Sequence, residues 1–323
     1  MAKARILIAY PLEPQYLARV GSVSTELEVI YRPNQAPNDM TACLADVEIL
    51  LTYRAAFAPE AAPRLRWIQM TGAGVDHLQY EPIMKTDVII TNAHLFGSPI
   101  AEYVFGSILC YSRKFSKTLS EFQGRREWPK NPWDSHVGRE LNSSTLGIIG
   151  YGDIGKAVGG IGRGFGMRVV AVRKSVRKSY EQDGVKILPA HNLKRLLAIS
   201  DFVVVCPPLT LETVGLIGQE ELRLMKPEAY LVNVSRGKVV DQAALTKALQ
   251  EGWIAGAGLD VFAEEPLAKD SELFEMPNVI LTPHIAGISS RYGDRLTRLF
   301  CENLRRYLKG KPLRYLVDKN RGY

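Results

Sequence analysis

The sequence predicts an α/β protein with parallel β-sheets in two domains. Short runs rich in valine and isoleucine alternate with helical patterns along the chain, an alternation typical of strand–helix–strand units. The length of 323 residues suits two domains better than one hydrophobic core. Hydrophobic residues make up 46% and charged residues 23% of the chain, which is the balance of a globular protein and not of a disordered or fibrous one.

The candidate strands fall into two series. The segments between them are long enough for crossover helices. Four strands in the first third would form one small sheet, and they are expected at residues 5–10, 47–52, 66–70 and 88–91. Six later strands would form a longer, Rossmann-like sheet, and they are expected at residues 145–149, 168–172, 202–206, 230–234, 256–261 and 279–282.

Two helices and a connector complete the pattern. A helix is expected over about 99–120, because proline is tolerated in a first turn and apolar residues then recur at helical spacing. An irregular connector with Trp128 and Trp133 follows over 123–140. The stripe of leucines in the last helix, 291–308, has nothing to pack on unless the chain returns to the first domain. We therefore expect a discontinuous domain, 1–98 with 287–323, and a second domain, 99–286, inserted into it.

Charge and cysteine content limit the cellular compartments and the partners to be expected. Lys and Arg exceed Asp and Glu by 41 to 34. No nucleic-acid motif accompanies the basic clusters, and an anionic cofactor with an anionic substrate would account for the surplus equally well, so a nucleic-acid partner is not expected. The four cysteines lie far apart without a paired motif, which favours a reducing compartment and no metal site. The chain offers no signal-peptide core and no apolar run of membrane-spanning length. We expect a cytoplasmic protein with no membrane partner.

A glycine-rich turn follows the strand expected at 145–149. Its residues are Gly150, Tyr151, Gly152, Asp153, Ile154 and Gly155. Gly150 would allow a tight turn, Gly152 the close approach of backbone to a pyrophosphate, and Gly155 close packing of helix on strand. The alternative is an ordinary glycine turn. The flanking strand–helix–strand pattern favours dinucleotide binding, so we expect 99–286 to be the dinucleotide-binding domain and 1–98 with 287–323 to be the substrate domain.

The helix after this turn has an unusual composition, and the strand after that helix bears on the choice between NAD and NADP. Four further glycines fall between residues 159 and 164, and interior glycine destabilises a helix, so the helix is expected to be short or tightly packed. The next strand ends at Arg173, Lys174 and Ser175, where an acidic residue would bind the ribose of NAD. Basic side chains there suit the 2′-phosphate of NADP, so NADP is the expected cofactor. NAD stays possible if these charges are only solvated.

Three chemistry-bearing residues follow strands of the second series. Reduction of a 2-keto acid needs a proton donor and a cation as well as a hydride. His284 could donate the proton with Glu265 as its partner, and Arg236 could hold a carboxylate in bidentate fashion. All three come just past strand ends, where ligands collect in an open α/β sheet. Taken singly, each could be an ordinary turn or surface residue.

Together with the glycine turn, these motifs resemble the D-isomer-specific 2-hydroxyacid dehydrogenase family, glyoxylate/hydroxypyruvate reductases included, over nearly the whole chain. The resemblance implies Arg236 as substrate-binding cation, Glu265 as partner of the histidine and His284 as acid/base. It places Asp260 at the nicotinamide carboxamide. It also assigns to the cofactor site Cys206, Pro207 and Val234, and to the substrate site Arg54, Ala73 and Gly74, the last two in a loop with small residues whose backbone can approach an anion.

The resemblance implies an oxidoreductase that transfers a hydride between NAD(P)H and a small 2-keto or 2-hydroxy acid of the D series. Glyoxylate or hydroxypyruvate with NADPH is the expected pair. A phosphoglycerate dehydrogenase-type enzyme is one alternative, and a corepressor-like protein that only senses a dinucleotide is another, although the intact Arg236, Glu265 and His284 favour an enzyme. The resemblance also implies a homodimer packed through the cofactor domain, with the helix after Pro99 and the Trp128–Trp133 connector as candidate contacts.

Overall fold

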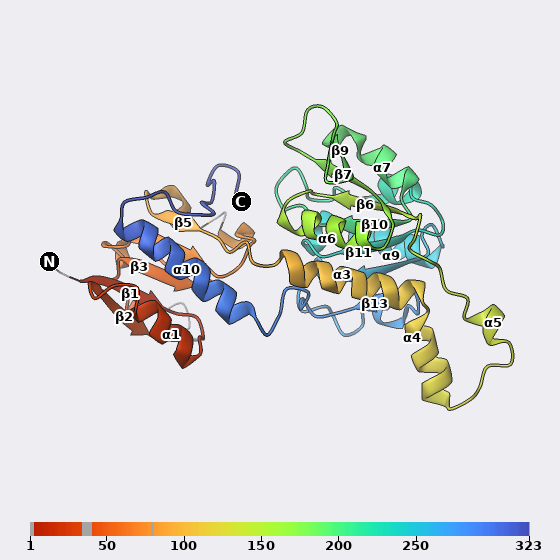
Figure 1. The fold of residues 1–323 in the computed structure, drawn as a ribbon, viewed down its shortest axis with the longest axis horizontal. Helices are drawn as coiled ribbons and strands as arrows, with labels where there is room; N and C mark the ends of the chain where they lie inside the picture. The colour runs from red at the N-terminus through yellow and green to blue at the C-terminus, as the bar shows by residue number, and fades with distance from the viewer. Residues whose placement is uncertain (1–2, 34–40, 79–80, 323) are drawn as a thin grey trace. The chain divides into compact units, whose positions relative to one another are not determined.

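The chain forms two compact units (Figure 1). The computed structural model describes residues 3–33, 41–78 and 81–322. Unit 1 combines Met1–Phe96 with Ser289–Tyr323, and unit 2 is Gly97–Ile288. Each unit contains its own mainly parallel sheet with helices, so the predicted α/β class, with one domain inserted into a discontinuous other, is confirmed.

Unit 1 contains a five-stranded parallel sheet in the order β2-β1-β3-β4-β5. Its elements are β1 (Ala4–Ile8), α1 (Pro14–Gly21), β2 (Leu27–Tyr31), β3 (Ile49–Thr52), β4 (Trp67–Met70), β5 (Ile89–Thr91) and α10 (Tyr292–Leu308). Short 3₁₀ turns lie at Pro59–Ala61, Asp76–Leu78 and Pro82–Lys85.

Alternation along the strands builds the core of unit 1. Ile6 and Ile8 of β1 are fully buried on the side of the sheet that α10 covers through Leu296 and Phe300. Leu7, between them in sequence, packs in a separate cluster with other strand residues. The leucine stripe of α10 therefore finds its partner in the N-terminal sheet, as its amphipathic pattern requires.

The sequence analysis missed β2. Glu28 interrupts its short apolar run, which hides the strand from pattern arguments. In the structure Glu28 lies opposite Arg5 in the β1–β2 register, and its carboxylate accepts a 3.0 Å bond from the guanidinium. A charged pair across two neighbouring strands thus replaces the missing apolar position.

Unit 2 contains an eight-stranded sheet in the order β13-β12-β11-β10-β6-β7-β9-β8, parallel except for the β8–β9 pair. Its regular elements begin with α3 (Gly97–Ser112), β6 (Thr145–Ile149), α6 (Asp153–Gly164), β7 (Arg168–Arg173), β8 (Tyr180–Gln182), β9 (Val185–Pro189) and α7 (Leu193–Ile199). They continue with β10 (Phe202–Val205), α8 (Gln219–Arg223), β11 (Tyr230–Asn233), α9 (Gln242–Gln250), β12 (Gly256–Leu259) and β13 (Val279–Leu281). Short 3₁₀ turns lie at Ala190–Asn192, Gly237–Val239 and Glu272–Glu275. The sequence analysis did not predict β8 and β9.

The glycines of α6 have two different environments. α6 packs beside α3 (Figure 1) and against β6. A Cβ on Gly162 would lie 2.6 Å from Leu146 of β6, so this glycine brings helix and strand together. A Cβ on Gly160 would meet nothing within 4 Å. Close packing therefore explains part of the glycine content, and nothing in the structure explains Gly160.

The expected single helix over 99–120 is wrong, because α3 ends at Ser112. Arg139 donates its backbone N–H to the Ser112 carbonyl at 2.7 Å, and Lys114 has a left-handed backbone with φ 58°. The returning chain thus takes a carbonyl that a longer helix would use. We call residues 113–138 the arm. It contains α4 (Phe115–Thr118), a π-helical turn (Leu119–Gly124) and α5 (Pro132–Ser135), and it extends away from the sheet of unit 2 (Figure 1).

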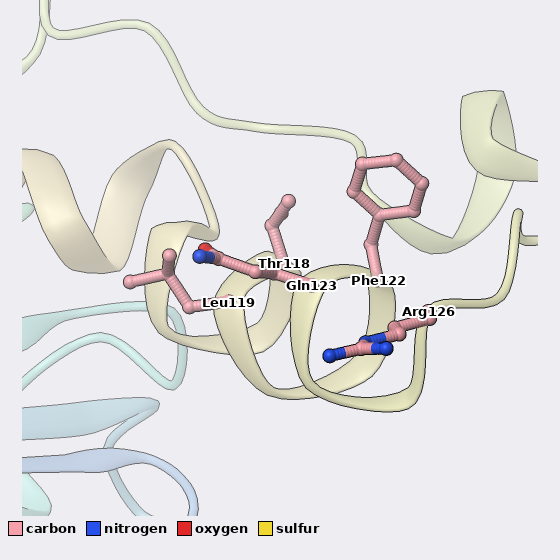
Figure 2. Close-up of a pocket in the computed structure, with 5 residues that line it drawn as sticks. All are labelled: Thr118, Leu119, Phe122, Gln123 and Arg126. Atoms are coloured by element: carbon pink, nitrogen blue, oxygen red, sulfur yellow. The ribbon is translucent and has the colours of Figure 1, made fainter.

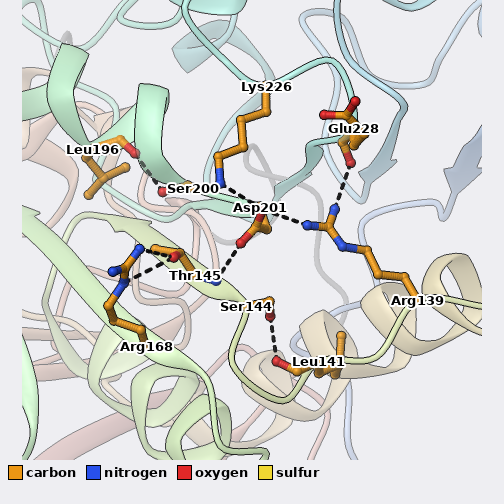
Figure 3. Close-up of polar contacts among 10 residues, drawn as sticks. All are labelled: Arg139, Leu141, Ser144, Thr145, Arg168, Leu196, Ser200, Asp201, Lys226 and Glu228. Atoms are coloured by element: carbon orange, nitrogen blue, oxygen red, sulfur yellow. Dashed lines mark hydrogen bonds and ion pairs between the residues drawn. The ribbon is translucent and has the colours of Figure 1, made fainter.

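A charged cluster fixes Arg139, the residue that follows the arm, beside the sheet of unit 2 (Figure 3). The Asp201 carboxylate accepts bonds from Arg139 at 2.6 Å, from Lys226 at 2.9 Å and from the backbone N–H of Thr145 at 2.7 Å. Burial raises the pKa of Asp201, but these hydrogen bonds and positive charges outweigh it and leave the pKa below its usual value. Asp201 therefore stays ionised and ties three segments together.

Candidate active site

The candidate site residues of unit 2 lie along one edge of its sheet. The glycine turn follows β6, Cys206 and Pro207 follow β10, and Arg236 follows β11. Asp260 and Glu265 come after β12, and His284 comes after β13. These strands are consecutive neighbours and parallel, so all these segments start at the same carboxyl edge.

The glycine turn has a geometry that suits a dinucleotide. Gly150 has φ 93°, and a Cβ there would lie 2.7 Å from the backbone nitrogen of Pro207. A Cβ on Gly155 would lie 2.3 Å from the Gly150 carbonyl oxygen. Gly152, the residue before α6, has nothing within 4 Å of its Cβ position. Gly150 and Gly155 permit the turn. Gly152 leaves its backbone open where a pyrophosphate can approach the start of a helix.

The other residues of this turn differ in exposure. Tyr151 is buried, Ile154 is half-buried and Asp153 is exposed in the first turn of α6. The Cys206 thiol donates to the carbonyl oxygens of Gly150, at 3.0 Å, and Ile149. Burial raises the pKa of Cys206 to about 12, so the thiol stays protonated and acts as a donor that braces the turn.

The end of β7 carries the residues expected near the adenosine ribose. Arg173 is half-buried as the last residue of the strand, and Lys174 and Ser175 follow it in exposed positions. The Lys174 ammonium lies 2.6 Å from the Glu212 carboxylate in the loop after β10. The basic character of this position is therefore partly offset by an acidic side chain distant in sequence.

Glu265 and His284 form the central pair of the site. His284 Nδ1 lies 2.8 Å from one carboxylate oxygen of Glu265, and the other oxygen accepts the Phe262 backbone N–H at 3.0 Å. His284 has φ 55°, a left-handed conformation that is rare outside glycine. Its N–H donates to the carbonyl oxygens of Asp260 and Thr282. The carboxylate can thus hold Nδ1–H, which leaves Nε2 as the second proton-carrying nitrogen.

Asp260 holds the turn that carries the histidine. Its buried carboxylate accepts the Thr282 hydroxyl at 2.6 Å and the backbone N–H groups of Ile285 at 2.8 Å and Ala286 at 2.9 Å. The Tyr103 hydroxyl of α3 lies 2.6 Å from the same Thr282 hydroxyl. Burial raises the pKa of Tyr103 to about 12, so this link stays a neutral hydrogen bond. Asp260 thus positions the turn that carries His284. Its expected contact with the nicotinamide carboxamide stays a prediction.

Arg236 lies in a loop that a buried asparagine shapes. The Asn233 side chain accepts the Ser235 N–H at 3.1 Å and donates to the Arg236 carbonyl at 3.2 Å. The Ser235 hydroxyl donates to the carbonyl oxygen of Pro207. Val234, the residue before Ser235, is buried. The half-buried Arg236 donates one guanidinium N–H to the Ser235 carbonyl.

Gly237 brings the arginine loop against the segment that leads to Glu265. A Cβ on Gly237 would lie 1.8 Å from the carbonyl carbon of Phe262 and 2.3 Å from the nitrogen of Ala263. Both atoms belong to the backbone, so no side-chain rotation could make room. The glycine after Arg236 is therefore a condition for the two loops to meet.

A pocket of about 630 Å³ opens beside the pair. Glu265 and His284 line it together with seven other residues, most of them apolar, Phe262, Pro266, Leu267, Phe274, Leu281, Thr282 and Pro283. The Glu265 and His284 side chains stay partly exposed, at 36% and 44%, so a ligand in the pocket can reach them along a mainly apolar wall.

The expected substrate residues Arg54, Ala73 and Gly74 lie in unit 1. Arg54 follows the end of β3, and its backbone is held by the Thr52 hydroxyl, which donates to the Arg54 carbonyl at 2.7 Å. The Ala73–Gly74 loop follows β4, and the Asn92 side chain donates to the Ala73 carbonyl at 2.8 Å. The structure places both segments at the carboxyl edge of the unit 1 sheet, and not in the unit that contains Arg236 and His284.

Comparison with known proteins identifies the family. Residues 105–286 match the NAD binding domain of the D-isomer specific 2-hydroxyacid dehydrogenases. A glyoxylate reductase of Korarchaeum cryptofilum is 39% identical over 264 residues, which cover 80% of this chain and 78% of the relative. The chain belongs to the D-isomer specific 2-hydroxyacid dehydrogenase family. It is an oxidoreductase that transfers a hydride between a nicotinamide cofactor and a small 2-keto or 2-hydroxy acid.

Solved structures support the same D-2-hydroxyacid dehydrogenase fold. A family member from Aeromonas salmonicida subsp. salmonicida matches with a TM-score of 0.86 and 31% identity, covering 98% of this chain and 100% of its own. An NADPH-dependent glyoxylate/hydroxypyruvate reductase from Sinorhizobium meliloti, in complex with NADP and sulfate, matches with a TM-score of 0.83 and 26% identity over 99% and 100% of the two chains.

Several residues of this dehydrogenase site escaped the sequence analysis. Asn233, Gly237, Thr282 and Tyr103 contact the loops of the named residues without an obvious chemical role of their own. Their closeness in sequence to Arg236 or His284 could have drawn notice to Asn233, Gly237 and Thr282. Tyr103 is 179 residues from Thr282 in sequence, and no local pattern connects them.

Two further observations concern the described part of the chain. Within it, no three His, Cys, Asp or Glu side chains gather closely enough to hold a metal ion. None of its helices combines the length and the apolar character needed to cross a membrane.

Proposed function

We propose that this dehydrogenase reduces glyoxylate, hydroxypyruvate or a similarly short 2-keto acid to the D-2-hydroxy acid, and that it prefers NADPH. The 2.8 Å contact between Glu265 and His284 carries the proposal, because it is the arrangement that a proton donor to a developing alkoxide requires. The names of the relative from Korarchaeum cryptofilum and of the structural neighbour from Sinorhizobium meliloti support the choice of substrate.

The residues of the chain have distinct parts in the proposed reaction. Bound NADPH supplies the hydride. Glu265 holds Nδ1 of His284 and stabilises the charged imidazole, so Nε2 can give its proton to the substrate's carbonyl oxygen. The Arg236 guanidinium binds the substrate carboxylate, and the small residues of the Ala73–Gly74 loop let its backbone N–H groups approach a substrate anion. Arg54 contacts the substrate in the same proposal.

The cofactor contacts follow from the edge of the unit 2 sheet. The backbone around Gly152 and the start of α6 hold the pyrophosphate, and the other residues of the turn shape it. Arg173, Lys174 and Ser175 bind the 2′-phosphate of NADP, because two cations and a hydroxyl can pair with a phosphate. The 2′-hydroxyl of NAD carries no charge for the two cations to pair with. Cys206, Pro207, Val234 and Asp260 lie at the end of the sheet proposed for the nicotinamide.

A panel of 2-keto acids, assayed with each cofactor, tests this function. Glyoxylate and hydroxypyruvate with NADPH should give the highest kcat/KM, and the product of hydroxypyruvate should be the D isomer. His284→Ala should lower kcat by about 100- to 10,000-fold, the range of one general acid. Turnover of only a phosphorylated acid would support a phosphoglycerate dehydrogenase instead, and full activity of the His284 variant would support a dinucleotide-binding protein without chemistry.

We propose that the enzyme is a cytoplasmic homodimer that pairs through the cofactor unit. The arm supports this, because Trp128 and Trp133 are 77% and 87% exposed and Leu119 is also exposed. A pocket of about 390 Å³ on the π-helical turn adds a hollow, lined by Thr118, Leu119, Phe122, Gln123 and Arg126 (Figure 2). Light scattering should give twice the mass of 36.0 kDa, and Trp133→Ser should shift it toward the monomer.

A further inference from the structure

The ion pair between Lys174 and Glu212 lies at the border of the proposed adenosine site. Lys174 comes one residue after the end of β7, and Glu212 lies in the loop after β10. These two strands flank β6, whose end begins the glycine turn. The 2.6 Å contact therefore joins the two loops on either side of the dinucleotide turn.

The position of Glu212 is set by its own turn. The Thr213 hydroxyl accepts the Thr210 N–H at 2.7 Å and donates to the Pro208 carbonyl at 2.7 Å, and the Thr213 N–H donates to the Thr210 carbonyl at 2.9 Å. Glu212 lies inside this bonded turn, and its carboxylate reaches the Lys174 ammonium just after the end of β7. The hydrogen bonds of the turn thus place Glu212 within reach of Lys174.

We infer that Glu212 is a cofactor-specificity residue that competes with the 2′-phosphate of NADP for Lys174. This inference rests on the proposed cofactor site. The Lys174 ammonium is paired with Glu212, and a phosphate that binds there must take over that cation. Both side chains are well exposed, at 62% and 67%, so the exchange needs only a rotation of flexible side chains. NADH lacks this phosphate, so its affinity should not depend on the ion pair.

The expected effect is modest and specific. An exposed ion pair has a small free energy, so freeing Lys174 should tighten NADPH by about three- to fivefold. Higher salt should reduce the gain, because exposed charges are screened. Glu212 therefore sets how strongly the enzyme discriminates between the two cofactors, while Arg173 and Lys174 provide the attraction.

Binding titrations without substrate test the inference. Dissociation constants for NADPH and NADH are measured by nicotinamide fluorescence on wild type, Glu212→Gln, Lys174→Gln and the double variant. Glu220→Gln is the matched control, since Glu220 forms a similar exposed pair with Lys194, at 3.3 Å, in the same unit. Glu212→Gln should tighten NADPH about three- to fivefold and leave NADH unchanged, and Glu220→Gln should change neither.

The double variant separates competition from simple repulsion. If Glu212 acts by occupying Lys174, Glu212→Gln has no effect on NADPH once Lys174 is Gln. An equal gain in both backgrounds, or the same gain from Glu220→Gln, would overturn the inference. The NADP preference is tested separately, by the wild-type ratio of the two constants and by the loss of NADPH affinity in Lys174→Gln. A wild type that binds NADH more tightly than NADPH would contradict the proposed NADPH preference. The inference on Glu212 would still require that Glu212→Gln tightens NADPH binding.

Discussion

Gly237→Ala is expected to disable the enzyme by separating two of its loops. Ordinary van der Waals contact begins at 3.4 Å, and the new Cβ would lie 1.8 Å from the Phe262 carbonyl carbon and 2.0 Å from its oxygen. The Arg236 loop and the segment leading to Glu265 must therefore move apart by about 1.6 Å, a shift that a close-packed interior does not absorb. A misplacement of about 1 Å can cost on the order of 100-fold in rate.

The assay compares kcat/KM for the best 2-keto acid with the NADPH dissociation constant. We expect kcat/KM to fall by about 100-fold or more and NADPH affinity to fall by a smaller factor, because the three atoms nearest to the new Cβ belong to Phe262 and Ala263 and none belongs to the glycine turn at the end of β6. Gly160→Ala is the control. Its Cβ meets nothing within 4 Å, so this variant should keep full activity and gain up to about 1 kcal/mol of stability.

Two results would refute the reasoning on Gly237. One is wild-type kcat/KM in Gly237→Ala, which would mean that the loops can separate without loss. The other is equal loss of activity and of NADPH binding, which would indicate general unfolding; thermal melting of the same samples distinguishes that from a local effect.

Two further substitutions test the hydrogen-bond networks. Asp260→Asn should lower kcat and leave a backbone N–H of the His284 turn without an acceptor, at a cost of roughly 1–3 kcal/mol in unfolding free energy; unchanged kcat would contradict a positioning role. Asp201→Asn should destabilise unit 2 by roughly 1–3 kcal/mol at neutral pH, since it removes the charge that Arg139 and Lys226 pair with. Because the folded pKa of Asp201 is lowered, its contribution is present above the ordinary carboxyl pKa of about 4 and is lost as the pH falls through the folded pKa. Urea unfolding at several pH values checks this, and a difference between wild type and variant that persists undiminished in acid would contradict it.

Much of the fold could be predicted because buried parallel strands leave strong local patterns. The run Thr145–Ile149 is wholly buried and has the bounds that its apolar residues indicate. The strands that escaped prediction, β2, β8 and β9, lack an uninterrupted apolar run. β8 is exposed along its length and exists as an antiparallel partner of β9 at the sheet edge, and β2 depends on the pairing of Glu28 with Arg5.

The arm shows the same limit for helices. Apolar spacing after residue 112 suits a continued helix, so local propensity alone predicts one. The helix ends because the chain returns 27 residues later and Arg139 takes the Ser112 carbonyl. Asp201 then fixes Arg139 in place. Such an ending depends on contacts that are distant in sequence, and no local rule anticipates it.

The sequence by itself determined the α/β class, the inserted domain and the family chemistry, because glycine turns and strand-end residues leave short, ordered motifs. Only the tertiary structure decided how those motifs are held. It placed Glu265 2.8 Å from His284, put Asp260 beneath the histidine turn and brought Glu212 to Lys174. These contacts join residues from different strand-end loops, and the distance between two loops follows from packing and hydrogen bonding of the whole sheet rather than from the residues that the loops contain.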